Sequence, residues 1–308
     1  MKMSSVDFLE AIVEAVSEKS GIPRDRIRLQ IDPGNASQNE LRLVVSRWEE
    51  EKAGAICAFS LTQIYEKHRL GESISDIAEE ISTHVSGAEM GEMLDTVNDL
   101  EEYAKVRDRL VIRAVNYEER RQRLGKAVYN RIGDIALVLY LKVKESEGSL
   151  SSALIPGDLV RFWGREEEDV FQEALLNTFL LFPPRLLRWK DVFTDPDYQG
   201  EDFMASGYQK GLAPGAEGNC ISNMARVNGA VSVFLPGVAG RLCELMGNDL
   251  YMAFTSMHEV MVHNAATTDP AMLREVLKDT IAQTTPACDF LSDKIYRYEK
   301  EGGRIIQL

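Results

Sequence analysis

The chain has 308 residues and a formal net charge of −14 at pH 7, with 44% hydrophobic and 27% charged residues. These proportions are ordinary for a globular protein with one large domain or two modest ones, and they exclude disorder of the whole chain. The net charge opposes non-specific binding to nucleic acids or anionic membranes, which depends on clustered lysine and arginine, so we expect no direct nucleic-acid binding.

Residues 1–108 read as an N-terminal α+β subdomain. Apolar residues fall on one face of a first helix from Val6 to Val16, which Gly21-Ile22-Pro23 ends. Three short β-like runs follow, with a turn at Asp32-Pro33-Gly34-Asn35, and then three helices, the second of which begins with the capping box Ser73-Ile74-Ser75-Asp76. The expected strands are 27–31, 41–46 and 54–59, and the expected helices are 61–69, 74–85 and 94–106.

Residues 109–308 read as a C-terminal α+β domain. The apolar stretch 132–143 predicts a central strand, entered from a short helical turn. Glycines and prolines interrupt residues 194–219, where we expect a flexible loop. The other expected strands are 110–115, 150–155, 221–226, 230–235, 250–255, 258–262 and a β-like C-terminal tail, and the expected helices are 156–163, 166–181, 236–246 and 270–284.

Helices and short strands are mixed without sustained βαβ alternation. This order predicts an α+β fold, with mixed or antiparallel sheets and packed helices rather than a Rossmann-type fold. We expect neither a cofactor nor a metal site, because no glycine-rich phosphate motif is present and the four cysteines form no CxxC pair.

No apolar run approaches the roughly 20 residues that cross a bilayer. Residues 1–10 carry acids and serines in an amphipathic pattern rather than a signal sequence. We therefore expect a cytoplasmic protein that does not enter membranes.

Three blocks of residues resemble a bacterial family of domains of unknown function, the family 5688 type. They span roughly residues 110–300 and comprise Asn116-Tyr117-Glu118 with Asp134-Ile135-Ala136, Asp158-Leu159 and Trp163-Gly164 with Asn177 to Pro184, and Asn228-Gly229-Ala230 with Leu235-Pro236-Gly237-Val238 and Ser256 to Val260. The resemblance implies a cytoplasmic bacterial protein, often from gut-type anaerobes and sometimes encoded near mobile elements. It implies no activity, cofactor or catalytic residue.

The pair His258-Glu259 is the catalytic candidate. It lies in the stretch Ser256 to His263, where the two histidines are five residues apart and do not form HExxH. His258 and Glu259 would serve as base and partner if a distant nucleophile or metal ligand came near. The alternative is a polar strand end satisfied by backbone contacts.

Arg120, Arg121 and Trp189 are the binding candidates. The two arginines belong to a basic stretch that would suit a phosphate or an acidic partner, or would form a solvated helix face paired with Glu118 and Glu119. Trp189 follows Phe182-Pro183-Pro184-Arg185 and, with Trp163, suggests a ledge for a partner or a cover over a core edge. The basic stretch comprises Arg107, Arg109, Arg113, Arg120, Arg121, Arg123, Lys126 and Arg131.

These features favour a non-enzymatic protein-binding module, with the loop 194–219 or the His258 region as its binding surface. One alternative is a metal-dependent or His/Glu-based hydrolase that uses His258 and Glu259. Another is an acidic nucleic-acid mimic or anti-defence protein linked to a mobile element, which the charge of −14 would suit. The oligomeric state does not follow from the sequence.

Overall fold

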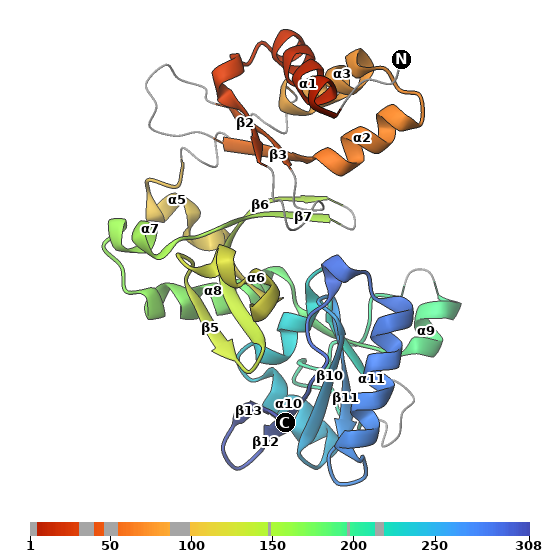
Figure 1. The fold of residues 1–308 in the computed structure, drawn as a ribbon. Coiled ribbons are helices and arrows are strands. Elements are labelled where there is room, and N and C mark those ends of the chain that lie inside the picture. Colours follow the sequence, from red (N-terminus) through yellow and green to blue (C-terminus); the bar gives the residue numbers. More distant parts are fainter. Residues whose placement is uncertain are drawn as a thin grey trace. The chain divides into compact units, whose positions relative to one another are not determined.

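Two units make up the chain, residues Met1–Glu102 and Tyr103–Leu308 (Figure 1). The sequence had placed a boundary at residues 108 and 109. The computed structural model describes residues 5–30, 40–45, 55–86, 99–146, 149–195, 198–212 and 219–308. Within these ranges, no helix is long and apolar enough to cross a membrane.

Unit 1 packs helices on an antiparallel sheet of order β1-β2-β3. The apolar stripe of the first helix forms its core, where Phe8, Ile12 and Val16 pack with Leu41 and Leu43 of the sheet. The elements of unit 1 are α1 (Ser5–Ser20), a 3-10 turn (Arg24–Arg26), β1 (Ile27–Gln30), β2 (Glu40–Val45), β3 (Ala55–Ser60), α2 (Leu61–Arg69) and α3 (Ile74–Ser86).

The predicted capping box of unit 1 is confirmed. Ser73 Oγ accepts a hydrogen bond from the Asp76 N–H, as the capping box predicts. The predicted turn at 32–35 and residues 94–98 of the predicted helix lie outside the described residues. A single helix up to Val106 is wrong, because a turn at Leu100 and Glu101 precedes α5 (Tyr103–Val106) and the 3-10 turn η3 (Arg107–Arg109).

The first sheet of unit 2 contains the long apolar strand β6. It is antiparallel, with the order β4-β6-β5 and with β7 paired to β6 beside β5. The Ile112 N–H donates to Thr178 Oγ1, which ties the helix α8 to this sheet. The elements are β4 (Leu110–Asn116), α6 (Tyr117–Leu124), β5 (Tyr129–Ile132), β6 (Ile135–Ser146), β7 (Ser149–Leu154), α7 (Gly157–Phe162) and α8 (Glu167–Leu181).

The chain enters β6 from a hairpin, so the predicted helical turn is wrong. Strand β5 runs back along β6, and Gly133 turns the chain with φ of +60°, a left-handed conformation that favours glycine. The sequence did not predict strand β5, because its residues are half-buried or exposed and its sequence is polar.

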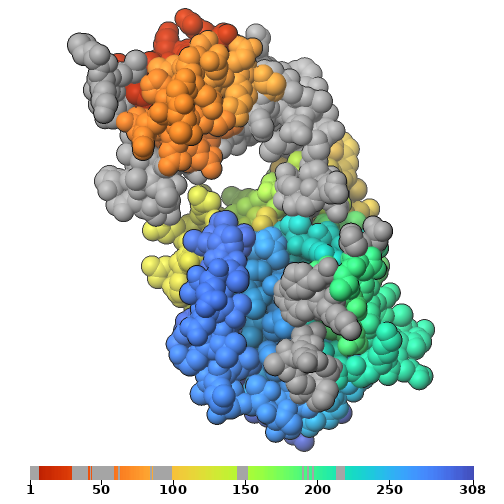
Figure 2. Space-filling view, turned by 90° about the vertical axis from the view of Figure 1, so that its right-hand side faces the viewer, coloured from red at the N-terminus to blue at the C-terminus, as the bar shows by residue number. Residues whose placement is uncertain are grey.

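The second sheet of unit 2 is antiparallel, with the order β13-β12-β10-β11-β9-β8. Helix α11 packs Leu273 and Leu277 against Ala253 of β10 and Ile295 of β12, and Figure 2 shows this helix along the surface of the unit. The elements are β8 (Pro184–Leu187), α9 (Trp189–Thr194), β9 (Cys220–Asn223), the 3-10 helix η4 (Gly229–Phe234), α10 (Val238–Met246), β10 (Leu250–Ser256), β11 (Glu259–Asn264), α11 (Pro270–Thr284), the 3-10 turn η5 (Ala287–Asp289), β12 (Ile295–Glu299) and β13 (Arg304–Gln307).

Two elements of this region differ from the sequence prediction. The expected strand 230–235 is instead the 3-10 helix η4. Residues 229–233 are all buried, so the alternation of buried and exposed residues that distinguishes a strand from a helix is missing there. Strand β8 was not expected after Pro183 and Pro184. It is an edge strand, where the missing N–H of Pro184 costs no ladder hydrogen bond.

The segment 194–219 is partly described. Its residues 198–212 bury Phe203 and Leu212, and Glu201 forms an isolated β-bridge with Leu186. Glu201 also accepts hydrogen bonds from Arg188 and Tyr208. Residues 196–197 and 213–218 of the predicted loop lie outside the described residues.

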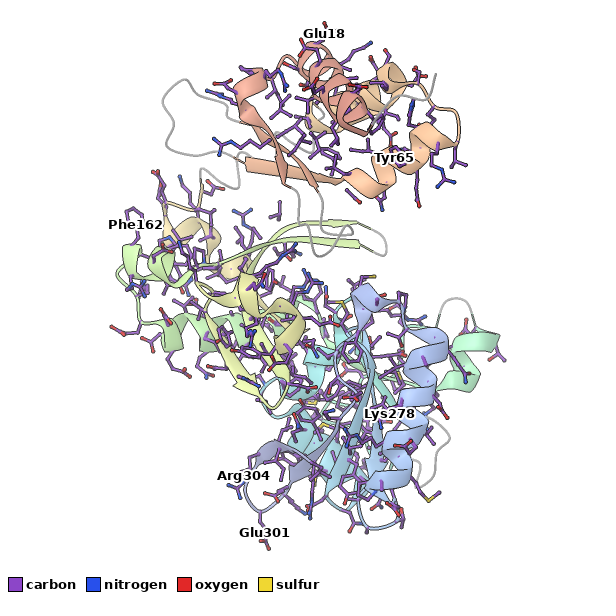
Figure 3. The ribbon with its side chains drawn as sticks, viewed as in Figure 1. Glu18, Tyr65, Phe162, Lys278, Glu301 and Arg304 are labelled. Atoms are coloured by element: carbon purple, nitrogen blue, oxygen red, sulfur yellow. The ribbon has the colours of Figure 1, made fainter. Side chains whose placement is uncertain are left out.

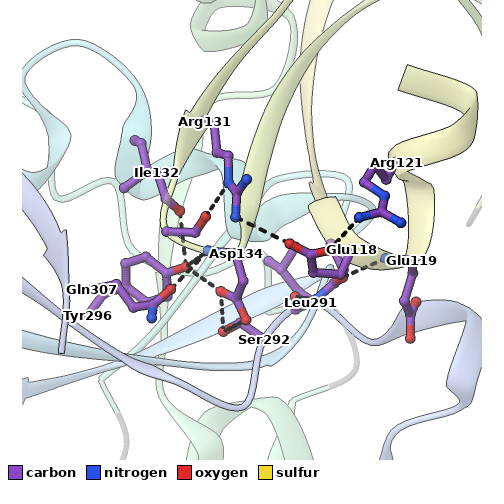
Figure 4. A network of polar contacts seen from close by, with 12 residues as sticks. Glu118, Glu119, Arg121, Arg131, Ile132, Asp134, Leu291, Ser292, Tyr296 and Gln307 are labelled. Carbon is purple, nitrogen blue, oxygen red and sulfur yellow. Dashed lines mark hydrogen bonds and ion pairs between the residues drawn. The ribbon is translucent and has the colours of Figure 1, made fainter. Parts of the chain in front are cut away.

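A polar network joins the two sheets of unit 2 (Figure 4). The Asp134 carboxylate, in the turn between β5 and β6, accepts hydrogen bonds from the Tyr296 hydroxyl and from Ser292 Oγ. Its backbone N–H donates to Gln307 Oε1 at 2.9 Å. Asn116 Nδ2 donates to the Leu291 carbonyl. Two residues of the resemblance blocks, Asn116 and Asp134, thus attach one sheet to the other.

The antiparallel sheets and packed helices confirm the α+β prediction and show no Rossmann-type arrangement. All described strand pairings are antiparallel.

Candidate functional site

Arg113 is the one charged residue of strand β4 and lies half-buried beside η4. Its Nη1 donates to Ser152 Oγ at 2.7 Å, and its Nη2 donates to Asn228 Oδ1 at 2.9 Å. Its guanidinium lies over the Tyr140 ring, 5.0 Å from the centroid. The partners of this cation are therefore neutral groups from β7, β6 and the start of η4.

The charge of Arg113 is not balanced by any ion pair among the described residues, and neither is that of Arg120 on α6. Burial lowers the pKa of the Arg113 guanidinium; the nearby Tyr140 raises it, and the positive charge of Arg120 lowers it further. A partly desolvated cation beside a second cation is electrostatically unfavourable unless an anion joins them.

Asn228 is held in place by its backbone. It has φ of 53° and ψ of 28°, the left-handed conformation that asparagine tolerates better than most residues. Its N–H donates to His258 Nδ1 at 3.1 Å. The next residue, Gly229, packs so closely that a Cβ atom would lie 2.5 Å from the His258 carbonyl oxygen and 2.8 Å from the Asn223 nitrogen. This packing explains why Gly229 follows Asn228.

His258 has a partner at each ring nitrogen. Because the Asn228 N–H must donate, Nδ1 accepts, and the ring hydrogen is on Nε2. Nε2 lies 3.5 Å from Asp289 Oδ1, and the His258 carbonyl accepts from Ser222 Oγ at 2.7 Å. In this arrangement the imidazole has no free basic nitrogen for a general base.

Glu259, the other catalytic candidate, has different neighbours. Its Oε1 accepts from Thr255 Oγ1 at 2.9 Å, and its Oε2 lies 3.5 Å from Cys220 Sγ. Burial raises the pKa of the Cys220 thiol, and the Glu259 charge raises it further, so this thiol stays protonated. The side chains of His258 and Glu259 thus belong to two separate groups of contacts.

His263 lies on β11 and pairs with Tyr251 of β10. Burial lowers the pKa of its imidazole. Among the described residues, no group of three or more His, Cys, Asp or Glu side chains is arranged to hold a metal ion.

The two candidate arginines of α6 have different surroundings. Arg121 lies 3.9 Å from Glu118, which also pairs with Arg131 at 3.3 Å (Figure 4). This is the solvated helix face that the sequence offered as an alternative. Arg120 has no ion pair among the described residues, and its positive charge adds to burial in lowering the pKa of Arg113. Trp189 begins α9, and its side chain lies outside the described residues.

Tyrosines and arginines gather on one face of the first sheet of unit 2. Directly paired residues share a face, and the register pairs Arg113 and Tyr129 with Val138, and Arg131 with Ala136. Tyr140 lies two residues from Val138 on the same face. The Arg131 guanidinium stacks 3.8 Å from the Tyr117 ring centroid, and the Tyr117 and Tyr129 rings are 5.9 Å apart. We call Tyr117, Tyr129, Tyr140, Arg113, Arg120 and Arg131 the tyrosine–arginine surface.

A second polar region is a depression of about 740 Å³ beside the β12–β13 hairpin, whose tip carries Glu301 and Arg304 (Figure 3). Its charges are largely neutralised within the protein. Arg297 Nη2 lies 2.8 Å from Asp249 Oδ2, and Arg304 Nε lies 3.2 Å from Glu299 Oε2. We therefore place the candidate site at Arg113, where the cations have no acidic partner among the described residues.

A family model of unknown function, DUF5688, matches residues 5–300, almost the whole chain. The chain belongs to the DUF5688 family. Comparisons with curated proteins and with solved structures give no match. The family resemblance is thereby confirmed, and membership in DUF5688 brings no activity with it.

The sequence predicted neither Ser152 nor Asn228 as a site residue; Asn228 was named only within a block of the family resemblance, and Arg113 only as one residue of a basic stretch. One signal was available, because Arg113 is a charged residue inside the run Leu110 to Val115, in which every other residue is apolar. A charge at that position of a buried strand requires a polar partner or a ligand.

Proposed function

We propose that this DUF5688 member is a non-enzymatic protein-binding module whose partner binds the tyrosine–arginine surface. The observation that carries the proposal is the set of half-exposed tyrosines beside Arg113 and Arg120, which have no acidic partner among the described residues. Tyrosine and arginine are enriched among the residues that dominate the energy of protein interfaces. In a chain of net charge −14, a local basic surface selects an acidic region of a partner.

The environment of His258 supports a binding role over the hydrolase alternative. Both ring nitrogens have partners, and Glu259 contacts Thr255 and Cys220. The nucleic-acid mimic requires an acidic surface as its active face, whereas the unpaired charges at this site are positive. The composition and the family resemblance support a cytoplasmic bacterial setting.

A site-specific photo-cross-linker tests the proposal. The full chain would carry p-benzoylphenylalanine in place of Tyr129, and a matched control would carry it in place of Met272, which is 70% exposed on α11. Both would be irradiated in extracts of cells that encode the protein, with and without nuclease treatment. We expect a discrete protein adduct from position 129 that is absent from position 272.

A charge variant adds a second criterion. Arg131→Glu reverses a charge of the surface, and Arg304→Glu makes the same change on the β12–β13 hairpin, at an arginine whose side chain is 71% exposed. We expect Arg131→Glu to remove the adduct and Arg304→Glu to retain it. Equal labelling from positions 129 and 272, or an adduct that nuclease destroys, would overturn the proposal.

A further inference from the structure

Arg113 and three other polar side chains, those of Arg120, Ser152 and Asn228, present hydrogen-bond donors. Arginine has no acceptor, so Asn228 must turn its Oδ1 toward Arg113, which directs Nδ2, a donor, to the other side. Ser152 Oγ also accepts from Arg113, and its own O–H remains available to donate. Arg120 adds a guanidinium with five N–H donors. We call Arg113, Arg120, Ser152 and Asn228 the donor cluster.

The free donors of this cluster have no acceptor among the described residues. Neither Asn228 Nδ2 nor the Ser152 hydroxyl donates to any of them. Asn228 is a buried residue, 5% exposed, but its Nδ2 is absent from the buried unpaired polar atoms of the described part, so this atom retains some contact with solvent. Arg113 Nε is one of those buried atoms without an acceptor. Arg113 and the free donors beside it therefore have no carboxylate partner in the part of the chain that the structure describes.

We infer that the donor cluster binds a single oxyanion, the carboxylate or phosphate group of a partner, at the Arg113 guanidinium, with the positive charge of Arg120 adding to the attraction. The inference rests on the proposed function for the source of this group, since an acidic protein segment would supply it. The planar fork of a guanidinium matches the oxygens of both anions. Partial burial of Arg113 strengthens the attraction, because the effective dielectric constant is lower there than in water.

His258 acts here as a positioning residue. Its Nδ1 accepts the N–H of Asn228, which fixes the left-handed backbone and thereby the direction of the Asn228 amide. The donor cluster thus accounts for the proximity of two blocks of the family resemblance, residues 228–230 and 256–260.

Titration of the full chain, labelled with ¹⁵N-arginine, with inorganic phosphate and separately with acetate tests the inference at low ionic strength. We expect the Arg113 and Arg120 Nε–H signals to shift in a saturable way. Arg120→Gln should weaken binding at least about tenfold, or ~1.4 kcal/mol. Arg121→Gln is the matched control, with the same charge loss on the same helix, and should change the dissociation constant by less than about twofold, as expected for an exposed charge at the rim.

The two probes distinguish the source of the anion. Tighter binding of phosphate indicates a phosphorylated group, and equal or tighter binding of acetate indicates a carboxylate. Absence of saturable shifts with both probes would overturn the inference, and so would equal losses in Arg120→Gln and Arg121→Gln, which would indicate a diffuse electrostatic effect.

The role of His258 has its own readout. His258→Ala should weaken anion binding, and His258→Asn, whose Oδ1 can accept the Asn228 N–H, should restore it at least in part. Unchanged anion binding in His258→Ala would refute the positioning role.

The two proposals fail separately. Saturable anion binding without a cross-linked protein would refute the protein-binding function and leave the oxyanion site standing. A cross-linked partner that is retained in Arg120→Gln, in a chain that shows no anion binding, would support the function and overturn the oxyanion site.

Discussion

Gly229→Ala tests whether close packing at the start of η4 holds the candidate site together. The added Cβ would lie 2.5 Å from the His258 carbonyl oxygen and 2.8 Å from the Asn223 nitrogen, and closer still to Ser222 Oγ. Ser222 can rotate away, but it then loses its hydrogen bond to the His258 carbonyl. The two backbone atoms can move only with their strands.

The magnitude follows from two contributions. Overpacking of a well-filled site costs about 1–3 kcal/mol, and loss of a buried hydrogen bond costs about 1 kcal/mol more. We therefore expect a loss of about 2–4 kcal/mol in the free energy of unfolding of unit 2. For a unit of this size each kcal/mol lowers Tm by about 2–4 °C, so the decrease should be roughly 5–15 °C.

Urea and thermal unfolding followed by circular dichroism measure this change. Gly207→Ala is the matched control, because a Cβ there meets no atom within 4 Å. Its stability should differ from that of the parent by less than about 0.5 kcal/mol. If Gly229→Ala were as stable as Gly207→Ala, the tight approach of η4 to β9 and to the His258 turn would be refuted.

Three further predictions concern unit 2. Tyr296→Phe removes a hydroxyl that hydrogen-bonds Asp134, so chemical denaturation should show a loss of about 1–3 kcal/mol in the free energy of unfolding. The control Tyr251→Phe should stay near the parent value. Equal effects of the two substitutions would refute a special role for the hydrogen bond to Asp134. Burial opposes ionisation of Glu201, but hydrogen bonds from Arg188, Tyr208 and Lys210 outweigh it and lower its pKa to about 2. The folded pKa of Glu201 lies below the unfolded value, so its contribution to stability is present above about pH 4.5 and is lost as pH falls toward about 2. Glu201→Gln should therefore reduce the decline of the urea midpoint in that pH range. A parallel decline in both proteins would contradict the lowered pKa of Glu201. On α8, Leu175→Ala should lower the free energy of unfolding in urea by about 2–4 kcal/mol. Leu176→Ala, at a side chain that is 55% exposed, should lower it by less than about 1 kcal/mol. Similar losses in the two variants would show that the helix buries a different face.

Elements with strong local signals were predicted closely. Helix α11 begins at Pro270 after the cap Asp269, whose carboxylate accepts the Ala271 N–H, and it ends at Thr284 as the periodicity predicted. Helix α2 also has the predicted bounds, Leu61–Arg69. The hydrogen bonds and apolar stripes that define such helices lie within one or two turns of the chain, so the sequence contains the necessary information.

Strand β5, strand β8 and the 3-10 helix η4 were not predictable in the same way. A polar strand such as β5 forms because β6 offers it a partner, and β8 forms at the edge of a sheet despite Pro184. Residues 229–233 of η4 are all buried, so this run fits a strand or a helix equally well until the surrounding packing decides.

The sequence by itself determined the α+β class, the family and the presence of a basic stretch in an acidic chain. It also marked Arg113 as a charge inside an apolar strand. Only the tertiary structure decided which charges stay unpaired, because Asn228 is 115 positions from Arg113 and His258 is 30 positions from Asn228. Whether an arginine is a solvated surface charge or an unpaired cation that suits an anion depends on its burial and on neighbours from distant strands. The local sequence specifies neither of these.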